Sequence, residues 1–365
     1  MAVTRTMEAS RGGDAVNPGQ VRKIGSVAGT GSDPGIPGIG AADLGEIVNL
    51  PDGRMVAIFG DSFSGNNVGV GEHYRSVAVE VTGFEAQGRP RYGKVLNGPI
   101  GSRRELFRMP KEAKKIPGVV DTLPAGTITT SKTTYVMVVG TDPHLRPVGG
   151  SWLTEVTDHP ARGWKPVARS WRAWEPANPL GGAPTQLSGY QGSDGTVYIA
   201  ADSFDRGRHV RFHGVTLYRV HPATVTDRSC WQPWTGAGWG APGAAPAPLS
   251  PSDFGELSFA EIDGHAVLSG FNQASGCVEV RVAAGPTEIF TSSPTVIAHQ
   301  HPGHEHTHNF VFHNYGGFIV PGSTLDKLAI LVSKWGHGDY NTQLFLANVA
   351  PVGRATVVSP REGVI

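Results

Sequence analysis

Two aspartates near the start of the chain are the residues best placed to do chemistry. Asp43 lies in Ala-Asp-Leu-Gly-Glu, and Asp61 lies eighteen residues later in Phe-Gly-Asp-Ser-Phe. Residues 45 to 50 and 55 to 60 predict two strands, and Pro51-Asp52-Gly53-Arg54 predicts the turn between them. Because the first strand of a hairpin begins where the second ends, both carboxylates are expected at one rim of a β-structure. A carboxylate pair is the catalytic equipment of most glycoside hydrolases.

The same two residues also have a structural interpretation. Asp61 can begin an Asx-turn in its Gly-Asp-Ser loop, and Asp43 can do the same in its own turn, because aspartate side chains accept hydrogen bonds from nearby backbone amides. Both interpretations stand at the level of local sequence.

Composition indicates a folded, β-rich protein without a polyanionic partner. The 365 residues are 39% hydrophobic and 17% charged, and 50 Gly with 28 Pro indicate many tight turns rather than long helices. Lys plus Arg and Asp plus Glu number 31 each. We therefore expect no basic surface for nucleic acid or an anionic membrane, and a neutral polymer is the easier partner to accommodate.

The usual signals for secretion and membrane insertion are missing from the sequence. The N-terminal residues lack the apolar core of a signal peptide, and no later stretch approaches the roughly 18 apolar residues of a membrane span. We expect neither classical secretion nor membrane insertion. Cys230 and Cys277 are too few for a disulfide framework, and pairing between them stays open.

Strand-like runs cluster along the chain and predict its fold. Residues 1–22 are polar and Gly-rich and predict a short extended arm or attachment segment. Residues 23–365 are expected to form one all-β domain. Its strand clusters lie near residues 41–82, 125–157, 184–221, 253–285 and 307–350. Five such clusters predict a five-bladed β-propeller, with a two-sheet sandwich as the alternative.

Several short motifs occur in the order found in a known family. They are Ala-Asp-Leu-Gly at 42–45, Phe-Gly-Asp-Ser-Phe at 59–63, Tyr-Arg-Ser at 74–76, Tyr-Gly-Gly-Phe at 315–318 and Val-Ser-Lys-Trp-Gly-His-Gly-Asp-Tyr-Asn at 332–341. In order and spacing they resemble the bacterial and phage domain-of-unknown-function family 4185, from about Gly31 to Val349. That family includes glycoside hydrolase family 183, the endo-D-arabinanases of mycobacterial cell-wall arabinan.

The resemblance implies a five-bladed propeller with its active site at the central channel and Asp43 and Asp61 as the catalytic pair. One carboxylate then stays ionised, and the other carries a proton for the departing sugar oxygen. We assign Asp43 the nucleophile or base role and Asp61 the acid role, although no sequence feature sets that order. The implied substrate is a D-arabinofuranosyl polymer such as arabinogalactan or lipoarabinomannan. Two positions depart from the family, with Val320-Pro321 in place of His-Pro and Ser76-Val77 in place of Ser-Asn.

Further side chains are expected to contact the sugar. The family resemblance and the side-chain chemistry together suggest aromatic rings that stack on the sugar and polar groups that bond its hydroxyls. Glu256 can serve as a third carboxylate in the channel, whose charge would raise the pKa of a neighbouring catalytic carboxyl. Each of these side chains also admits an ordinary packing or surface role. The expected substrate-binding residues are Arg75, Glu256, His308, Asn309, Tyr315, Trp335, Tyr340 and Asn341.

The densest group of histidines lies between residues 299 and 308. In an extended segment His304, His306 and His308 would share one face, which suits a divalent cation. However, Pro302-Gly303 interrupts the strand, and neutral His308 and Asn309 also suit hydrogen bonds to furanose hydroxyls. We therefore expect a rim loop or sugar contact here, and no metal or other cofactor is predicted.

An extracellular substrate without a signal peptide has two explanations. In the first, the chain is a phage minor tail protein, which reaches the cell wall from outside as part of the virion, with other tail proteins as partners. In the second, it is a secreted enzyme whose numbering omits the signal peptide. Against the hydrolase stand a non-catalytic carbohydrate-binding protein that recognises a receptor and a purely structural tail protein. Carboxylates roughly 5 to 9 Å apart in an open channel would favour hydrolysis, the shorter separation with retention and the longer with inversion.

Overall fold

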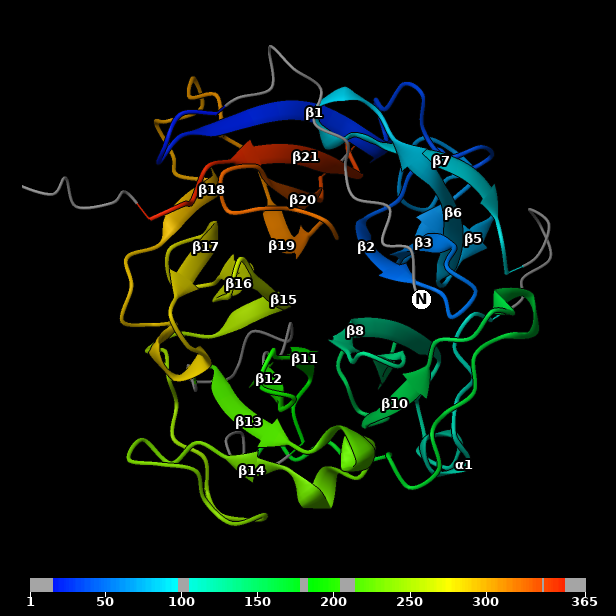
Figure 1. Ribbon diagram of the computed structural model, residues 1–365. Helices are drawn as coiled ribbons and strands as arrows, with labels where there is room; N and C mark the ends of the chain where they lie inside the picture. Colours follow the sequence, from blue (N-terminus) through cyan, green and yellow to red (C-terminus); the bar gives the residue numbers. More distant parts are fainter. Residues whose placement is uncertain (1–15, 98–104, 178–182, 204–213, 337, 352–365) are drawn as a thin grey trace, which may run out of the picture.

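A ring of β-sheets makes up the part of the chain that the structure describes. The computed structural model describes residues 16–97, 105–177, 183–203, 214–336 and 338–351. The sheets stand around a common centre (Figure 1). This arrangement confirms the predicted all-β fold of the propeller type. The helical segments among the described residues are short: α1 (Lys111–Lys114), η1 (Ala86–Gly88), η2 (Pro160–Arg162), η3 (Pro222–Thr224), η4 (Arg228–Cys230) and η5 (Pro286–Glu288).

The first sheet contains the predicted hairpin. Alternate side chains of its second strand pack in opposite directions: Ala57 and Phe59 face the last sheet, whereas Val56 and Ile58 face the next one. Both faces of the sheet are therefore buried, as expected where sheets stand side by side. The order is β2 (Leu44–Asn49), β3 (Met55–Phe59), β6 (Val77–Phe84) and β7 (Pro90–Val95), and β4 (Ser62–Phe63) pairs separately with β5 (His73–Tyr74).

The next sheet has seven strands and unites two of the predicted clusters. The order is β10 (Ser151–Glu155), β9 (Thr134–Thr141), β8 (Asp121–Thr129), β11 (Gln186–Gln191), β12 (Val197–Asp202), β13 (Thr216–Val220) and β14 (Gln232–Pro233). β8 and β11 pair in parallel, with Gly189 opposite Ile128. Gly126 permits this approach, because its φ is +100° and a Cβ there would lie 1.7 Å from Leu187 O. Hydrogen bonding thus joins the second and third predicted clusters instead of separating them.

Two four-stranded sheets complete the ring. Their orders are β15 (Phe254–Ile262), β16 (His265–Asn272), β17 (Cys277–Ala283) and β18 (Thr295–His299), and β19 (Asn314–Ile319), β20 (Leu328–Lys334), β21 (Asn341–Ala347) and β1 (Val21–Gly29). β1 pairs antiparallel with β21, so the first strand of the chain is the outer strand of the last sheet. Pairing begins at Val21, inside the predicted arm of residues 1–22. Residues 1–15 lie outside the described part, and the arm stays a prediction there.

Side-chain hydrogen bonds connect successive sheets at or next to their inner strands. At three junctions a serine hydroxyl accepts from a backbone N–H of the next sheet: Phe259 N to Ser188 Oγ (2.9 Å), Ile319 N to Ser258 Oγ (3.0 Å) and Leu44 N to Ser333 Oγ (3.0 Å). Between β8 and β2, Thr127 Oγ1 donates to Glu46 Oε1 at 2.6 Å. Apolar clusters fill the spaces between the same neighbours, so packing and buried hydrogen bonds stabilise the ring together.

The structure also addresses the membrane and disulfide questions. No helix among the described residues has the length and apolar character needed to cross a membrane. Cys230 is half-buried, Cys277 is buried, and both thiols are free. The pairing that the sequence left open is therefore absent.

Candidate functional site

The hairpin brings Asp43 and Asp61 to the same end of the first sheet. Asp43 directly precedes β2, and Asp61 follows β3 by two residues. Leu44 is paired with Phe59 in the strand register. A Cβ placed on Gly60 would lie 3.1 Å from Asp43 Oδ1, so the segment leading into Asp61 passes directly beside the Asp43 carboxylate. The two aspartates therefore lie on one rim of the ring.

Asp43 lies in a buried setting with two phenol neighbours. The side chain is only 5% exposed, and the Tyr315 hydroxyl donates to its Oδ2. Burial, together with the charges of Asp43 and Asp61, raises the pKa of Tyr340 well above its usual value, and a side-chain hydrogen bond to Asp43 contributes. Tyr340 therefore keeps its proton and can donate. Hydrogen bonds donated to a carboxylate favour its charged form, so the two phenols favour an ionised Asp43 against the opposing effect of burial.

Asp61 is more open to solvent and is paired with a histidine. Its Oδ1 lies 2.7 Å from His73 Nε2, on the short strand β5. The hydrogen bond to Asp61 is the main cause that raises the pKa of His73, against the opposing effect of partial burial. The imidazole also stacks on Phe63, with ring centroids 4.8 Å apart and an angle of 16°. This pairing gives Asp61 a fixed orientation and a positively charged neighbour at mildly acidic pH.

A third carboxylate, Asp121, meets this pair although the sequence analysis did not select it. It is the first residue of β8, and one ligand atom from each of Asp61, His73 and Asp121 lies within 4.8 Å of the others. Burial raises the pKa of Asp121 to about 6, despite a hydrogen bond from Thr122 N and the charge of Arg75. Asp121 begins an inner strand, and Asp43 directly precedes another. This shared position at the start of an inner strand is the sequence feature from which Asp121 could have been predicted.

Arg75 belongs to the same group. Its Nε lies 3.4 Å from Asp121 Oδ1, and its Nη1 lies 3.1 Å from Glu105 Oε1. Arg75 and His73 thus bring positive charge to Asp121 and Asp61. We call Asp43, Asp61, His73 and Asp121 the acid cluster; Arg75 borders it.

The acid cluster contains the one set of three candidate metal ligands found among the described residues. Two carboxylates and an imidazole can bind a divalent ion, but Arg75 and His73 already place positive charge there, which disfavours an added cation. Among the described residues, the weaker candidates of the sequence analysis, His304, His306 and His308, do not form a comparable set. The His304 and His306 rings stack 6.3 Å apart, and His308 Nε2 lies 2.9 Å from Val21 O.

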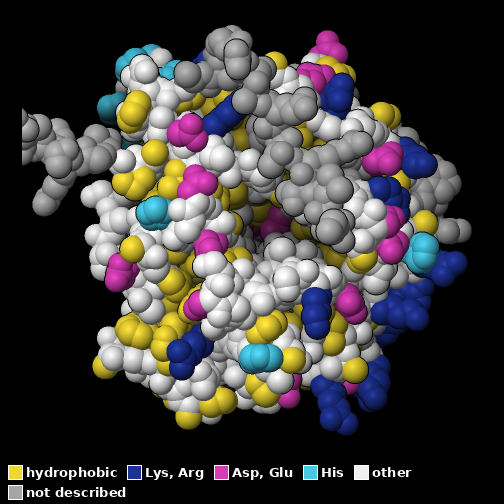
Figure 2. Space-filling view, viewed as in Figure 1, with side chains coloured by type: hydrophobic (Ala, Val, Ile, Leu, Met, Phe, Trp, Pro, Cys, Tyr) yellow, Lys and Arg dark blue, Asp and Glu magenta, His cyan; other side chains and the backbone are white. Residues whose placement is uncertain are grey.

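Two buried glutamates line a cavity near the ring centre. They are Glu256, which was predicted as a channel carboxylate, and Glu46, which was not. Burial raises the pKa of Glu46 to about 7, with Thr127 as its hydrogen-bond donor. A Cβ placed on Gly316 would lie 3.4 Å from Glu256 Cβ, so Glu256 lies next to the strand that carries Tyr315. Figure 2 shows a hollow at the centre of the molecule with an acidic side chain deep inside it.

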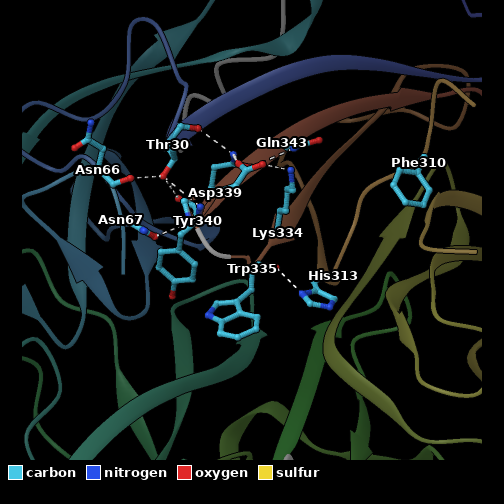
Figure 3. A network of polar contacts seen from close by, with 12 residues as sticks. Thr30, Asn66, Asn67, Phe310, His313, Lys334, Trp335, Asp339, Tyr340 and Gln343 are labelled. Atoms are coloured by element: carbon cyan, nitrogen blue, oxygen red, sulfur yellow. Dashed lines mark hydrogen bonds and ion pairs between the residues drawn. The ribbon is translucent and has the colours of Figure 1, made fainter. Parts of the chain in front are cut away.

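The other predicted sugar contacts divide into two groups. Tyr315 and Tyr340 contact Asp43, and Trp335 is 45% exposed on the segment after β20. Asn341, by contrast, is buried, and its Nδ2 donates to Thr30 O and to Asp339 Oδ1, so it anchors a loop. Its two partners, Thr30 and Asp339, are labelled in Figure 3.

His308 and Asn309 are not brought to the acid cluster. His308 is bonded to the carbonyl of Val21, at the opposite end of β1 from Gly29. It is the Gly29 end that lies against Ala42 and Tyr340, next to Asp43. Asn309 is hydrogen bonded to His299 through its side chain and its backbone carbonyl. Both residues therefore serve the loop between β18 and β19 instead of contacting Asp43 or Asp61.

Comparison with known proteins adds a family and a fold. The family model "Domain of unknown function (DUF4185)" matches residues 32–346. An uncharacterised 35.9 kDa protein of Mycolicibacterium smegmatis, from the 3' region of asd, is 36% identical over 331 residues, covering 86% of this chain and 92% of its own length. A candidate hydrolase from Bacteroides ovatus has a similar structure, with a TM-score of 0.55 at 17% identity over 85% and 86% of the two chains. A GH43_1 enzyme from Xanthomonas citri has a TM-score of 0.49 at 10% identity over 91% and 90%.

Proposed function

Since the chain belongs to the domain-of-unknown-function family 4185, we propose that it is an endo-acting glycoside hydrolase that cleaves D-arabinofuranosyl linkages of mycobacterial cell-wall arabinan. The observation that carries the proposal is the setting of Asp43, a buried carboxylate with two phenol donors beside the Asp61–His73–Asp121 group. In this proposal the seven-stranded sheet counts as two blades that share the β8–β11 pair, which makes the ring a five-bladed propeller.

Asp43 is the nucleophile or the general base in this proposal. Attack on an anomeric carbon, or removal of a proton from water, needs an ionised carboxylate. The hydroxyls of Tyr315 and Tyr340 favour that form of Asp43 and fix the direction in which its free lone pairs point. Burial keeps competing water away from the carboxylate, so its charge is available to the sugar.

The proton donor comes from the other side of the acid cluster. Asp61 was assigned this role, and its hydrogen bond to His73 allows it to exchange a proton with the imidazole. The raised pKa of Asp121, about 6, makes Asp121 a carboxyl that carries a proton in weakly acidic solution. We assign proton donation to this Asp61–Asp121 pair, whose nearest oxygens lie within 4.8 Å.

The proposed substrate is neutral, in keeping with the chain's equal numbers of acidic and basic residues. Arg75, which borders the acid cluster, offers hydrogen-bond donors to sugar hydroxyls, and the exposed Trp335 offers a stacking surface further along the chain of sugars. The polymer is arabinogalactan or lipoarabinomannan, as the family resemblance implies. Such a substrate places the protein outside the cell, either in the tail of a virion among other tail proteins or as an extracellular enzyme.

A non-catalytic, carbohydrate-binding tail protein is the second candidate. The exposed aromatic side chains Phe312 and Trp335 favour it, because they offer binding surface that hydrolysis alone does not require. In that case Asp43 and Asp61 would contact the sugar without cleaving it.

Digestion of purified arabinogalactan separates the two candidates. Wild type, Asp43→Asn and Asp61→Asn are incubated with the polymer, and released oligosaccharides are separated and identified by mass. Asp326→Asn serves as the matched control, because Asp326 is an exposed carboxylate two residues before β20, at the end of that strand remote from Asp43. Release by wild type and the control, abolished in both active-site variants, is the expected result. No release by folded wild type would overturn the hydrolase and leave the binding protein.

A further inference from the structure

Three aromatic rings form an exposed stack outside the acid cluster. Phe312 and His313 stack with centroids 3.9 Å apart at 24°, and His313 and Trp335 stack with centroids 5.7 Å apart at 25°. Phe312 is 54% exposed and Trp335 is 45% exposed. Exposed apolar side chains that lie next to one another in a single patch mark binding surfaces, whereas scattered ones do not. We call Phe312, His313 and Trp335 the aromatic platform.

The platform continues the hairpin that carries Tyr315. Tyr315 is opposite Ser333, and Asn314 is opposite Lys334. One step further, Trp335 N donates to His313 O at 3.2 Å, and His313 Nδ1 lies 3.1 Å from Trp335 O. His313 lies two residues from Tyr315, so the platform begins at most about 7 Å along the backbone from the residue that bonds Asp43.

The loop that follows Trp335 is anchored by polar contacts at several points. Lys334 forms an ion pair with Asp339, and Gly338 N donates to Asn67 Oδ1 at 3.2 Å. Tyr340 N donates to Thr30 Oγ1 at 3.2 Å. Figure 3 shows Trp335 and Tyr340 extending from this network in the same direction. A surface held in place before binding loses less conformational entropy when a ligand docks.

The charges around the platform indicate the chemistry of its occupant. Lys334, the lysine next to Trp335, is already paired with Asp339, so its charge is neutralised and not available to a phosphate or an acidic sugar. Neutral sugar rings stack their C–H faces on aromatic rings of this kind, and their hydroxyls remain in water at the edges. Continuity with Tyr315 and Asp43 makes the occupant part of the chain that reaches the acid cluster.

We infer that the aromatic platform is a distal subsite, which holds a sugar unit of a neutral polysaccharide chain away from the linkage that is cleaved. This inference rests on the proposed function, which places the cleaved linkage at the acid cluster. It assigns substrate contacts to Phe312 and His313, and it gives Trp335 a place on the binding path. A subsite at this distance favours long chains over single-residue substrates.

The test compares a polymer with a single-residue substrate. Steady-state kcat/KM is measured on arabinogalactan and on p-nitrophenyl α-D-arabinofuranoside for wild type, Trp335→Ala, Phe312→Ala and the conservative Trp335→Phe. Loss of one stacking contact is expected to lower kcat/KM on the polymer roughly three- to ten-fold, mainly through KM, and to lower the ratio of polymer to small-substrate activity by a similar factor. Trp335→Phe is expected to restore most of that ratio. Val296→Ala, an exposed apolar residue on β18, is the matched control.

A binding measurement keeps the inference separate from the hydrolase proposal. Affinity electrophoresis through gels containing arabinogalactan is done with the Asp43→Asn/Asp61→Asn double variant, with and without Trp335→Ala or Phe312→Ala. Retardation that either added alanine weakens supports the subsite even if wild type cleaves nothing. Equal retardation in all variants, or equal losses on polymer and small substrate, would overturn the subsite and leave a protein partner as the occupant of the platform. Melting temperatures verify that each variant is folded.

Discussion

The Tyr315 hydroxyl donates a hydrogen bond to Asp43 Oδ2 across 272 residues of sequence. Tyr315 lies on the inner strand of the last sheet, and Asp43 immediately precedes the inner strand of the first. Two further hydrogen bonds hold the same junction: Leu44 N donates to Ser333 Oγ, and Thr342 Oγ1 donates to Leu44 O. The candidate carboxylate is therefore positioned where the first and last sheets meet, and we expect loosening of this junction to reduce activity before the protein unfolds.

Replacement of Asp43 tests the centre of the proposal. Asp43→Asn keeps the shape and one carbonyl oxygen but removes the charge, so it is expected to lower kcat on arabinogalactan about 10²- to 10⁴-fold. Oligosaccharide release per unit time is the measurement, with Asp326→Asn as the control. Activity within a few-fold of wild type in a folded Asp43→Asn protein would exclude this residue from the chemistry.

Removal of the Tyr315 hydroxyl tests how Asp43 is kept ionised. Tyr315→Phe deletes a hydrogen bond to a charged group, which is worth about 1.5 to 3 kcal/mol, so kcat/KM is expected to fall roughly 10- to 100-fold. Because the ionised carboxylate loses a donor, the acid limb of the pH–rate profile should move to higher pH. Tyr92→Phe, in the same apolar cluster, is the control. An acid limb in the same place would show that Tyr315 acts through structure alone.

Asp121 is expected to set the alkaline limb of the profile. Burial raises the pKa of Asp121 to about 6, so its carboxyl loses the proton as pH rises through that value, and a rate that depends on the protonated form declines there. Asp121→Asn should lower kcat and remove that limb. The check is kcat/KM between pH 4 and 8 (roughly two units either side of the pKa) for wild type, Asp121→Asn and Asp61→Asn. An alkaline limb that survives in Asp121→Asn and disappears in Asp61→Asn would transfer the role to Asp61.

Glu46 should make the stability of the protein depend on pH. Burial raises the pKa of Glu46 from its usual 4.5 to about 7. Between these values the folded state binds more protons than the unfolded state, so the free energy of unfolding falls as pH rises through this window, by roughly 3 kcal/mol in all. Glu46→Gln cannot ionise and should flatten the dependence, whereas exposed Glu288→Gln should not. Urea unfolding at pH 5 (about half a unit inside the lower edge of the window) and at pH 8 (about one unit above it) provides the comparison, and an equal change in the free energy of unfolding for Glu46→Gln and wild type would contradict the prediction.

Gly126 is expected to be irreplaceable where β8 meets β11. Gly126 and Gly53 both have positive φ, +100° and +85°, but a Cβ would approach Leu187 O to 1.7 Å only at Gly126, with nothing within 4 Å at Gly53. Gly53→Ala should therefore cost about 1 kcal/mol, from backbone strain alone. Gly126→Ala should cost more than about 3 kcal/mol, because the parallel pairing must separate. Chemical denaturation of both variants gives the difference, and similar losses would show that the β8–β11 contact carries little stability.

The sequence predicted the parts of the site that depend on neighbouring residues better than the parts that depend on residues far apart in the chain. The hairpin that brings Asp43 and Asp61 to one rim follows from two apolar runs and a Pro-Asp-Gly turn, since adjacent strands joined by a tight turn have little freedom in how they pair. Tyr315 and Tyr340 were selected from motifs and do lie against Asp43. His308 and Asn309 were selected for their chemistry, and the fold places them in the loop between β18 and β19.

His73 and Asp121 show what local reasoning missed. His73 directly precedes the Tyr-Arg-Ser motif without belonging to it, and Asp121 begins a strand that no motif marks. Each gains meaning only because β5 and β8 come from neighbouring sheets that meet at Asp61. Likewise, β1 pairs with β21, a strand at the other end of the chain. The pairing of β8 with β11 depends on the close approach that one glycine, Gly126, permits. Strand order in a sheet reflects packing against neighbours more than intrinsic propensity.

By itself the sequence determined that this chain is all-β, that its strands come in clusters divided by Gly and Pro, and that Asp43 and Asp61 share a rim, because turn chemistry and alternation act over a few residues. Only the tertiary structure decided which side chains surround those carboxylates: Tyr315 and Tyr340 on Asp43, His73 and Asp121 beside Asp61. Those contacts form between sheets, where burial, shape and hydrogen bonding must be satisfied together, and no local periodicity encodes them.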